Sequence, residues 1–156
     1  MAEQLIQSLG LTKHPVEDGH FVETYRSEAC SCIYYMLRGD DTSCWHKVCK
    51  DEVWLYHSGS GCTARQTLIH TDGTKEVRLM GDPSAHHTDA STPVTAQSVV
   101  PANAWQTTTL VPSPDASGES VPWVLFTCVV SPAFEYPDLV TATEGELGEM
   151  LPNLTL

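Results

Sequence analysis

Basic residues are scarce in this chain. Its 156 residues include 8 Lys and Arg against 20 Asp and Glu, which gives a formal net charge of −12 at pH 7. The few basic residues are scattered along the chain, and an acidic surface repels phosphate backbones. We therefore expect no nucleic-acid partner, and we interpret the excess of acidic residues as a solvated surface.

Long hydrophobic runs are absent too. No apolar run approaches the roughly 20 residues that a helix needs to span a bilayer. The N-terminal stretch, MAEQLIQSLG, has neither a basic start nor an apolar segment of the length found in secretory signals. These absences predict a cytoplasmic protein without a membrane partner.

The six cysteines lack the spacing of a zinc site, because no Cys-x-x-Cys pair occurs in the chain. Cys30 and Cys32 fall in one predicted strand, and a chain of this length buries a core without covalent cross-links. We therefore expect reduced thiols rather than a disulfide scaffold or a structural zinc ion.

Short apolar runs broken by Gly and Pro make up most of the chain. They predict strands at residues 32–37, 52–57, 63–69, 76–79, 97–100, 104–111 and 123–130. Helical patterns are confined to residues 2–9 and 141–151. The polar stretches 81–95, which contains His86 and His87, and 112–122 indicate exposed loops. Many short strands without long intervening helices indicate an all-β sandwich or barrel with short terminal helices, formed by residues 1–156 as one domain.

Seven segments carry a more specific signal. They are residues 9–21, with LGL and HP, then ETYRS at 23–27, IYYML at 33–37, SCWHKV at 43–48, DEVW at 51–54, VPANAWQ at 100–106 and SPAFE at 131–135. In this order they resemble the DUF985 family, also called cupin_5, of the cupin superfamily. The resemblance implies a double-stranded β-helix, or jelly-roll barrel, assembled as a homodimer, and a kinship with deoxysugar epimerases. Asn103 replaces a family glycine, and we expect it to keep the turn because Asn tolerates a positive φ.

The stretch from residue 43 to residue 59 contains the side chains with the clearest chemistry. His46 precedes Glu52 by six positions, as the first histidine and the glutamate of the first cupin motif do. Val48 stands where metal-using cupins have a second histidine, and Gln106 stands where they have the histidine of a second motif. Two good ligands hold a transition metal only weakly. We therefore expect no cofactor; the alternative is a weakly held divalent metal on His46, Glu52 and Gln106.

An organic ligand is the favoured interpretation of these residues. A histidine next to a glutamate in an apolar barrel is suited to removing a proton beside a carbonyl group, and Gln106 would donate its amide to the developing oxyanion. Glu52, Trp54 and Tyr56 alternate along a predicted strand and so share one face. We expect Trp54 and Tyr56 to form pocket walls, with Tyr56 as a proton donor. Simple core packing is the alternative for both aromatic residues.

Three further side chains are candidates for ligand contacts. Arg26 is the cation nearest the motifs and suits a substrate carboxylate or phosphate, with a surface ion pair as the alternative. Tyr25 precedes it, and Tyr34 is a second aromatic candidate. His57 falls on the opposite face of its strand from Glu52, so we do not expect it to contact the ligand.

Three functions remain open on this sequence. The first is a metal-independent isomerase, epimerase or lyase that uses His46 and Glu52 on a carbonyl-containing metabolite or sugar derivative. The second is a non-catalytic protein that binds a small ligand. The third is a metal-dependent cupin such as an oxygenase. The sequence names no substrate, because barrel folds host many activities.

Overall fold

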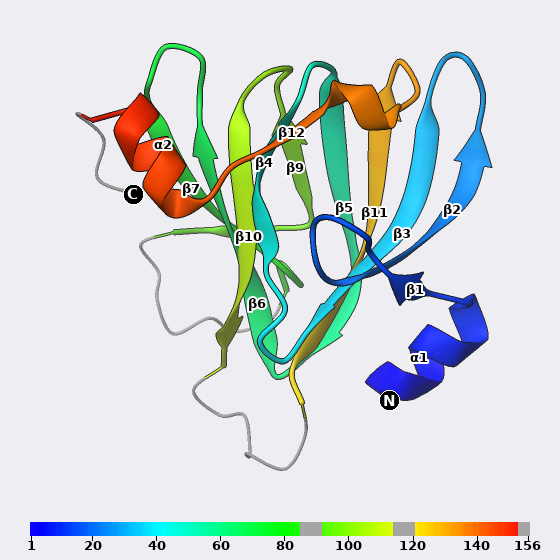
Figure 1. Ribbon diagram of the computed structural model, residues 1–156. Helices are drawn as coiled ribbons and strands as arrows, with labels where there is room; N and C mark the ends of the chain where they lie inside the picture. The colour runs from blue at the N-terminus through cyan, green and yellow to red at the C-terminus, as the bar shows by residue number, and fades with distance from the viewer. Residues whose placement is uncertain (85–91, 114–120, 153–156) are drawn as a thin grey trace.

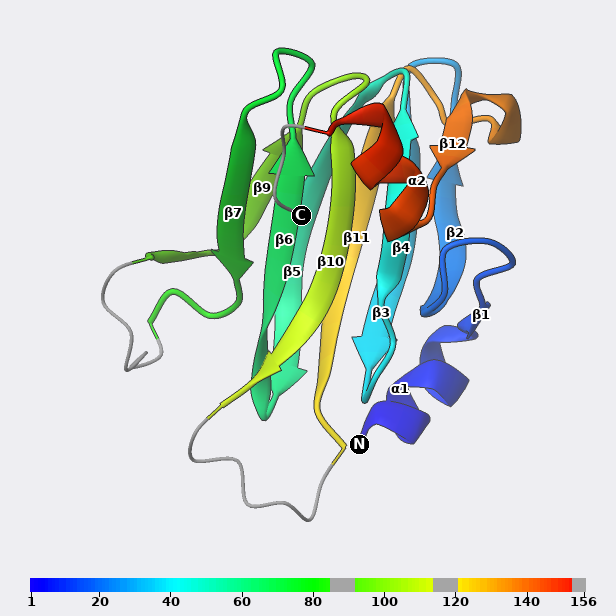
Figure 2. The ribbon, with the colours of Figure 1, turned by 60° about the vertical axis from the view of Figure 1, so that its left-hand side comes forward.

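Two six-stranded sheets pack face to face in the computed structural model, which describes residues 1–84, 92–113 and 121–152 (Figure 1). In spatial order, the first sheet contains β1 (Thr12–Lys13), β2 (His20–Arg26), β3 (Ser31–Arg38), β11 (Trp123–Ser131), β5 (Asp51–Ser60) and β9 (Gln97–Val100). The second contains β12 (Leu139–Thr141), β4 (Ser43–Val48), β10 (Trp105–Pro112), β6 (Cys62–Ile69), β7 (Lys75–Met80) and β8 (Val94–Thr95). Figure 2 shows the two layers from the side of β6 and β7.

The predicted all-β barrel with short terminal helices is confirmed. All seven predicted strands are present with small shifts at their ends, and β6 and β7 form the predicted antiparallel hairpin. The pattern misses β2, because none of its residues is fully buried, and β4, because the buried positions of that strand include Ser43 and His46. Polar buried residues weaken the alternation on which strand prediction rests.

The predicted loop at 81–95 needs one correction. Its last two residues form β8, which pairs with β7 in parallel. His86 and His87 fall outside the described residues, as does most of the loop predicted at 112–122.

An aromatic cluster fills part of the space between the sheets. Trp54 packs edge to face on Tyr35 and on Phe126, with ring centroids 5.5 Å and 5.3 Å apart. All three side chains are at most 1% exposed. Because edge-to-face pairs add to the stabilisation that burial provides, this cluster holds β3, β5 and β11 rigidly together.

The N-terminal helix α1 (Ala2–Leu9) covers the outer face of the first sheet. Its apolar residues Leu5, Ile6 and Leu9 pack, together with Tyr34, against the outward-facing side chains Met36, Trp123 and Leu125. The helix ends at Gly10, which adopts the left-handed conformation. The prediction of a helix over residues 2–9 is therefore confirmed.

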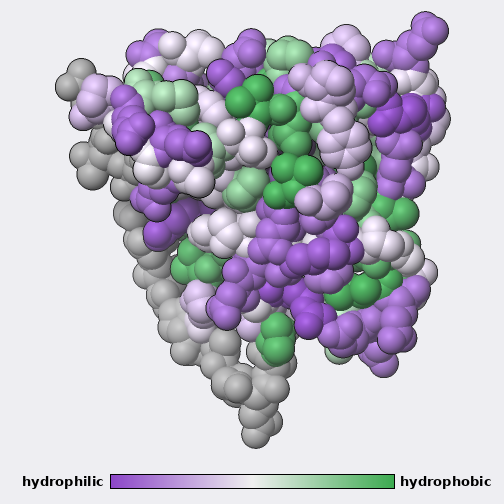
Figure 3. All heavy atoms as spheres, viewed as in Figure 1, coloured by the Kyte–Doolittle hydropathy of each residue, from purple (hydrophilic) through white to green (hydrophobic). Residues whose placement is uncertain are grey.

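The surface agrees with the acid-rich composition. Figure 3 shows hydrophilic residues over much of the face seen in Figure 1. The second helix, α2 (Glu144–Met150), begins at the capping residue Thr143 and buries Leu147, and a short 3-10 helix spans Tyr136–Asp138. No helix in the described parts of the chain is long and apolar enough to cross a membrane. The cysteines are free thiols, of which Cys128 is buried and Cys49 is exposed.

Two turns contain a residue with a positive φ and contact a neighbouring strand. Asn103 has φ +66° and donates its N–H to the Val48 carbonyl, so the expectation that it keeps the turn is confirmed. Gly19 has φ +70°, and a Cβ there would lie 2.9 Å from the Met36 carbonyl oxygen and 3.0 Å from the Tyr35 hydroxyl. The neighbouring Asp18 carbonyl accepts a hydrogen bond from that hydroxyl. The segment 14–19 is thus fixed against β3.

The close approach at Gly19 predicts a large difference between two alanine substitutions. Gly10 has a similar φ of +66°, but no atom of the described ranges lies within 4 Å of its Cβ position, so Gly10→Ala carries the conformational cost alone. We expect Gly10→Ala to lower the free energy of unfolding by about 1–2 kcal/mol. Gly19→Ala should lower it by about 3 kcal/mol or more, because the clash with β3 is added. Urea unfolding of both variants measures this, and equal losses would contradict the described packing.

Candidate functional site

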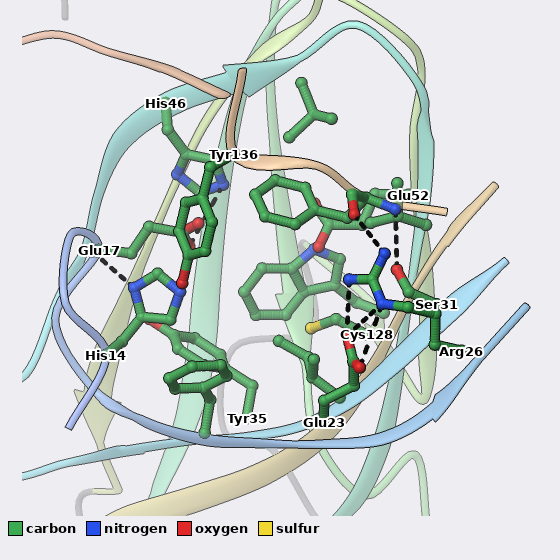
Figure 4. Close-up of a pocket in the computed structure, with 16 residues that line it drawn as sticks. His14, Glu17, Glu23, Arg26, Ser31, Tyr35, His46, Glu52, Cys128 and Tyr136 are labelled. Carbon is green, nitrogen blue, oxygen red and sulfur yellow. Dashed lines mark hydrogen bonds and ion pairs between the residues drawn. The ribbon is translucent and has the colours of Figure 1, made fainter. Parts of the chain in front are cut away.

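A cavity of about 290 Å³ lies between the sheets, bounded on one side by the segment 14–19 (Figure 4). Its wall combines apolar side chains from both sheets with six acidic, basic or histidine ones: His14, Glu17, Glu23, Arg26, His46 and Glu52. Figure 4 shows Glu17 between His14 and His46 on one side of the cavity, with Arg26 and Glu23 on the other. The site is therefore a small, partly charged chamber.

His46 is held as a charged imidazolium. It points inward from β4 and is 1% exposed. Its Nδ1 lies 2.7 Å from the Cys44 carbonyl oxygen, which can only accept, so Nδ1 carries a proton. Its Nε2 lies 3.6 Å from the Glu17 carboxylate. Burial lowers the pKa of His46, but Glu17, the Cys44 carbonyl and Glu52 outweigh burial and raise it to about 9.

His14 is held in the opposite state. Its Nδ1 accepts hydrogen bonds from the backbone N–H groups of Glu17, at 2.8 Å, and Val16, at 3.3 Å. An acceptor nitrogen has no proton, so the neutral ring carries its proton on Nε2. Burial lowers the pKa of His14, Glu17 opposes this effect and His46 adds to it. The cavity therefore holds one neutral and one charged histidine at neutral pH.

Glu52 is a desolvated carboxylate on β5. It is 7% exposed and its Oε2 accepts a 2.5 Å hydrogen bond from Gln106 Nε2. Burial raises its pKa and Glu17 adds to the rise, while His46 and Gln106 oppose it; the net shift is upward. The indole N–H of Trp54 acts in the same direction as Gln106, although its geometry falls short of a hydrogen bond.

Several residues predicted from the sequence meet at this cavity. His46, Glu52 and Trp54 line it, as the spacing of the motif and the alternation along β5 predict. Gln106 is 1% exposed and lies behind Glu52, where its amide N–H contacts the carboxylate rather than the cavity. Glu52 and Gln106 are therefore neighbours, but the Gln106 amide binds the Glu52 carboxylate instead of facing a ligand.

Other predicted residues lie elsewhere. Tyr56 packs on Phe126, further along β5, and does not line the cavity. Tyr34 lies on the outer face of the sheet, where it contacts His57, so His57 is on the face opposite Glu52 as expected. Tyr25 is 56% exposed at the end of β2.

Arg26 reaches the cavity but its guanidinium is engaged by the protein. Nε and Nη2 donate to Glu23, and Nη1 donates to the Phe134 carbonyl and to Glu135. Arg26 therefore forms ion pairs, which the sequence left open as the alternative to a contact with a substrate anion. A substrate anion would have to displace two carboxylates to reach it.

The sequence reasoning missed His14, Glu17 and Tyr35 as cavity residues. His14 and Glu17 lie on the segment before β2, which has no periodic pattern to show which way a side chain points. The available signal was their position in the segment 9–21, which resembles the family.

The donor groups do not fit a tightly held metal. Val48 lies in the cavity wall where a second histidine would stand, and the Gln106 amide oxygen already accepts a hydrogen bond from Gln66. Within the described residues, no group of three or more His, Cys, Asp or Glu side chains has the arrangement of a metal site.

The chain matches one protein family over most of its length. Residues 3–142 match the family described as Cupin superfamily (DUF985). Among solved structures, a hypothetical protein from Leishmania major is similar with a TM-score of 0.78 and 25% identity, over 97% of this chain and 93% of its own. A protein from Shewanella oneidensis is similar with a TM-score of 0.76 and 25% identity, over 97% and 90% of the two chains.

More distant similarity extends to the fold alone. Oxalate decarboxylase from Bacillus subtilis gives a TM-score of 0.61 at 13% identity, over 93% of this chain but 35% of the decarboxylase. A search of curated proteins found no significant sequence match. The match over residues 3–142 and the jelly-roll architecture confirm the resemblance carried by the seven segments. The chain belongs to the DUF985 family of the cupin superfamily.

Proposed function

We propose that this protein transfers protons on a small carbonyl-containing metabolite, as an isomerase, an epimerase or a related lyase. The observation that carries the proposal is the presence of a proton donor and a proton acceptor in one cavity. His46, with its pKa raised to about 9, holds a proton at neutral pH, whereas Glu52 is a carboxylate poorly solvated by water. A protonated donor and an ionised acceptor in the same cavity are typical of acid–base sites.

The charge states assign the roles. Glu52 removes the proton from the carbon beside the carbonyl group, and His46 donates a hydrogen bond or a proton from Nε2 to the carbonyl oxygen as negative charge develops there. The Nε2–H of His14 is a second donor for that oxygen. This assignment reverses the sequence hypothesis of His46 as the base, because a group with a pKa of about 9 is already protonated.

The reaction closes by returning the proton from Glu52. Return to the other face of the same carbon, after the intermediate has turned over in the cavity, gives an epimer. Return to the former carbonyl carbon gives an isomer when the neighbouring hydroxyl passes its proton to His46 and becomes the new carbonyl group. Elimination of a group one carbon further along would make the protein a lyase. All three outcomes share the same first step, which is why the site supports the class of reaction rather than one member.

The size of the cavity limits the substrate. A volume of about 290 Å³ is at the small end of ligand pockets and suits a metabolite of a few carbons or one sugar ring. Apolar walls from Ile33, Trp54 and Val130 would pack on the carbon skeleton. We therefore propose that the substrate is a small, neutral or singly charged carbonyl compound.

The first prediction concerns Glu52. Hydroxyacetone, dihydroxyacetone and pyruvate in ²H₂O serve as probes, and ¹H NMR follows the exchange of the hydrogens beside the carbonyl group. We expect Glu52→Gln to slow enzyme-dependent exchange by about 10²–10⁴-fold, because the base is lost. Glu144→Gln, the same change on the exposed helix α2, is the matched control and should leave exchange unaltered.

Two other results would point to the alternatives. Saturable binding of these probes without exchange by the wild type would support a non-catalytic binding protein. A stoichiometric metal in protein purified without chelator, lost on His46→Ala, would favour a metal-dependent cupin. Exchange that survives intact in Glu52→Gln would overturn the assigned base.

The second prediction concerns the pH dependence of stability. The pKa of His46 rises from its ordinary value of 6.5 to about 9 on folding, so the stability it contributes is fully present below pH 6.5 and is lost as pH rises through 9. We expect the free energy of unfolding to fall by about 3 kcal/mol over this window. Urea unfolding between pH 6 and pH 9.5 measures the fall, which Glu17→Gln should largely remove. An equal fall in the variant would exclude Glu17 as the cause.

A further inference from the structure

Behind Glu52, a line of hydrogen bonds crosses the interior of the barrel. Gln106 Nε2 donates to Glu52 Oε2 at 2.5 Å, and Gln66 Nε2 donates to Gln106 Oε1 at 3.3 Å. Ser98 Oγ donates to Gln66 Oε1 at 2.5 Å, and Arg78 Nη1 donates to Ser98 Oγ at 2.8 Å. The line therefore joins a guanidinium group to the carboxylate proposed as the base.

The members of this line come from five strands and both sheets. Glu52 on β5 and Ser98 on β9 belong to the first sheet, whereas Gln66, Arg78 and Gln106 belong to the second. Gln66, Ser98 and Gln106 are 0%, 3% and 1% exposed, respectively. Polar groups buried this deeply destabilise the fold unless they are hydrogen-bonded, and apolar residues would fill the same space at a lower cost in free energy. Stability of the barrel alone gives no reason for this choice of residues.

The two ends fix the direction of every hydrogen bond. A guanidinium group can only donate and an ionised carboxylate can only accept. Because Glu52 accepts from the Gln106 N–H, the Gln106 amide oxygen faces Gln66 and accepts the Gln66 N–H. The Gln66 amide oxygen then faces Ser98, whose hydroxyl donates to it. Gln106 is turned in the same sense, so that its N–H faces Glu52. Neither amide can rotate without placing two acceptors against each other.

We propose that Arg78, Ser98, Gln66 and Gln106 form a one-way relay that orients Glu52 and holds it as an ionised acceptor. The relay occupies Oε2 and leaves Oε1 for proton transfer. Aligned hydrogen bonds in a low dielectric strengthen one another, so the cation at the far end acts on the carboxylate through its neighbours. Arg78 and Ser98 are thus positioning residues, although neither lines the cavity.

The anchor of the relay is firmly held. Arg78 forms two hydrogen bonds to Glu76, at 2.7 Å and 2.8 Å, and Glu76 contacts His70 at 2.9 Å. The Arg78 side chain is 25% exposed, so its charge keeps contact with water. On the cavity side, the groups that face Glu52 are His46, Glu17, Trp54 and Cys128, and none of them belongs to the relay. Changes in the relay therefore leave these neighbours in place.

The decisive variant is Gln66→Glu, which places an acceptor on both sides of position 66. Gln106 can then satisfy it only by turning its N–H away from Glu52. The readout is the side-chain amide ¹H–¹⁵N signal of Gln106 in the ligand-free protein, where the short bond to a carboxylate moves one proton downfield. We expect that proton to return to the position of an ordinary glutamine amide.

A milder variant covers the case in which Gln66→Glu fails to fold. Ser98→Ala removes the hydroxyl between Arg78 and Gln66, and should move the Gln106 signal part of the way upfield. Thr108→Val is the matched control, because Thr108 is equally buried on β10 and its hydroxyl has no hydrogen-bond partner among the residues that the structure describes. It should leave the Gln106 signal unchanged and the thermal midpoint equal or higher.

Enzyme-dependent deuterium exchange with hydroxyacetone gives the second readout, and this part rests on the proposed function. We expect the rate to fall about tenfold in Ser98→Ala and to remain near the wild-type value in Thr108→Val. An unshifted Gln106 signal in a folded Ser98→Ala variant would overturn the relay. A shifted signal with no exchange in the wild type would support the relay and refute the proposed chemistry.

Discussion

The ion pair between Glu17 and His46 is the interaction on which the rest of the site depends. A charge buried in an apolar barrel is costly unless a partner and hydrogen bonds compensate for the lost water. Glu17 supplies the partner for His46, and the Cys44 carbonyl supplies the hydrogen bond. With His46 charged, Glu52 has a positive neighbour in the cavity, which partly offsets its own burial. Each charge in the chamber is tolerated because of another.

This balance depends on a short segment with no regular structure. Residues 14–19 carry His14 and Glu17 into the cavity, and they hold this place because Gly19 allows the backbone to approach β3. The Glu17 carbonyl also accepts a hydrogen bond from the backbone N–H of Cys44, so the segment is tied to the strand that carries His46. The two partners of the ion pair are therefore positioned by the same contact between segment and strand.

The sequence predicts His46, Glu52 and Trp54 well, because motif spacing and strand alternation determine where such side chains point. It could not predict the role of Gln106, since the orientation of that amide depends on Gln66, which is distant in the chain and adjacent only in the folded sheet. Glu17 was missed for a similar reason: its direction is set by tertiary contacts of a loop. A periodic pattern predicts on which face of a strand a side chain lies. The side chain that it contacts across the barrel depends on the assembled fold.

The contact between Arg26 and the Phe134 carbonyl has a consequence for how the protein acquires its site. These residues are 108 positions apart, and both border the cavity. Contacts of such sequence separation form slowly, because a long loop must close before they provide stabilisation. During synthesis, a nascent chain that has not yet reached β11 lacks one wall of the chamber. The wall of the cavity is therefore complete only when segments from both ends of this span are in place.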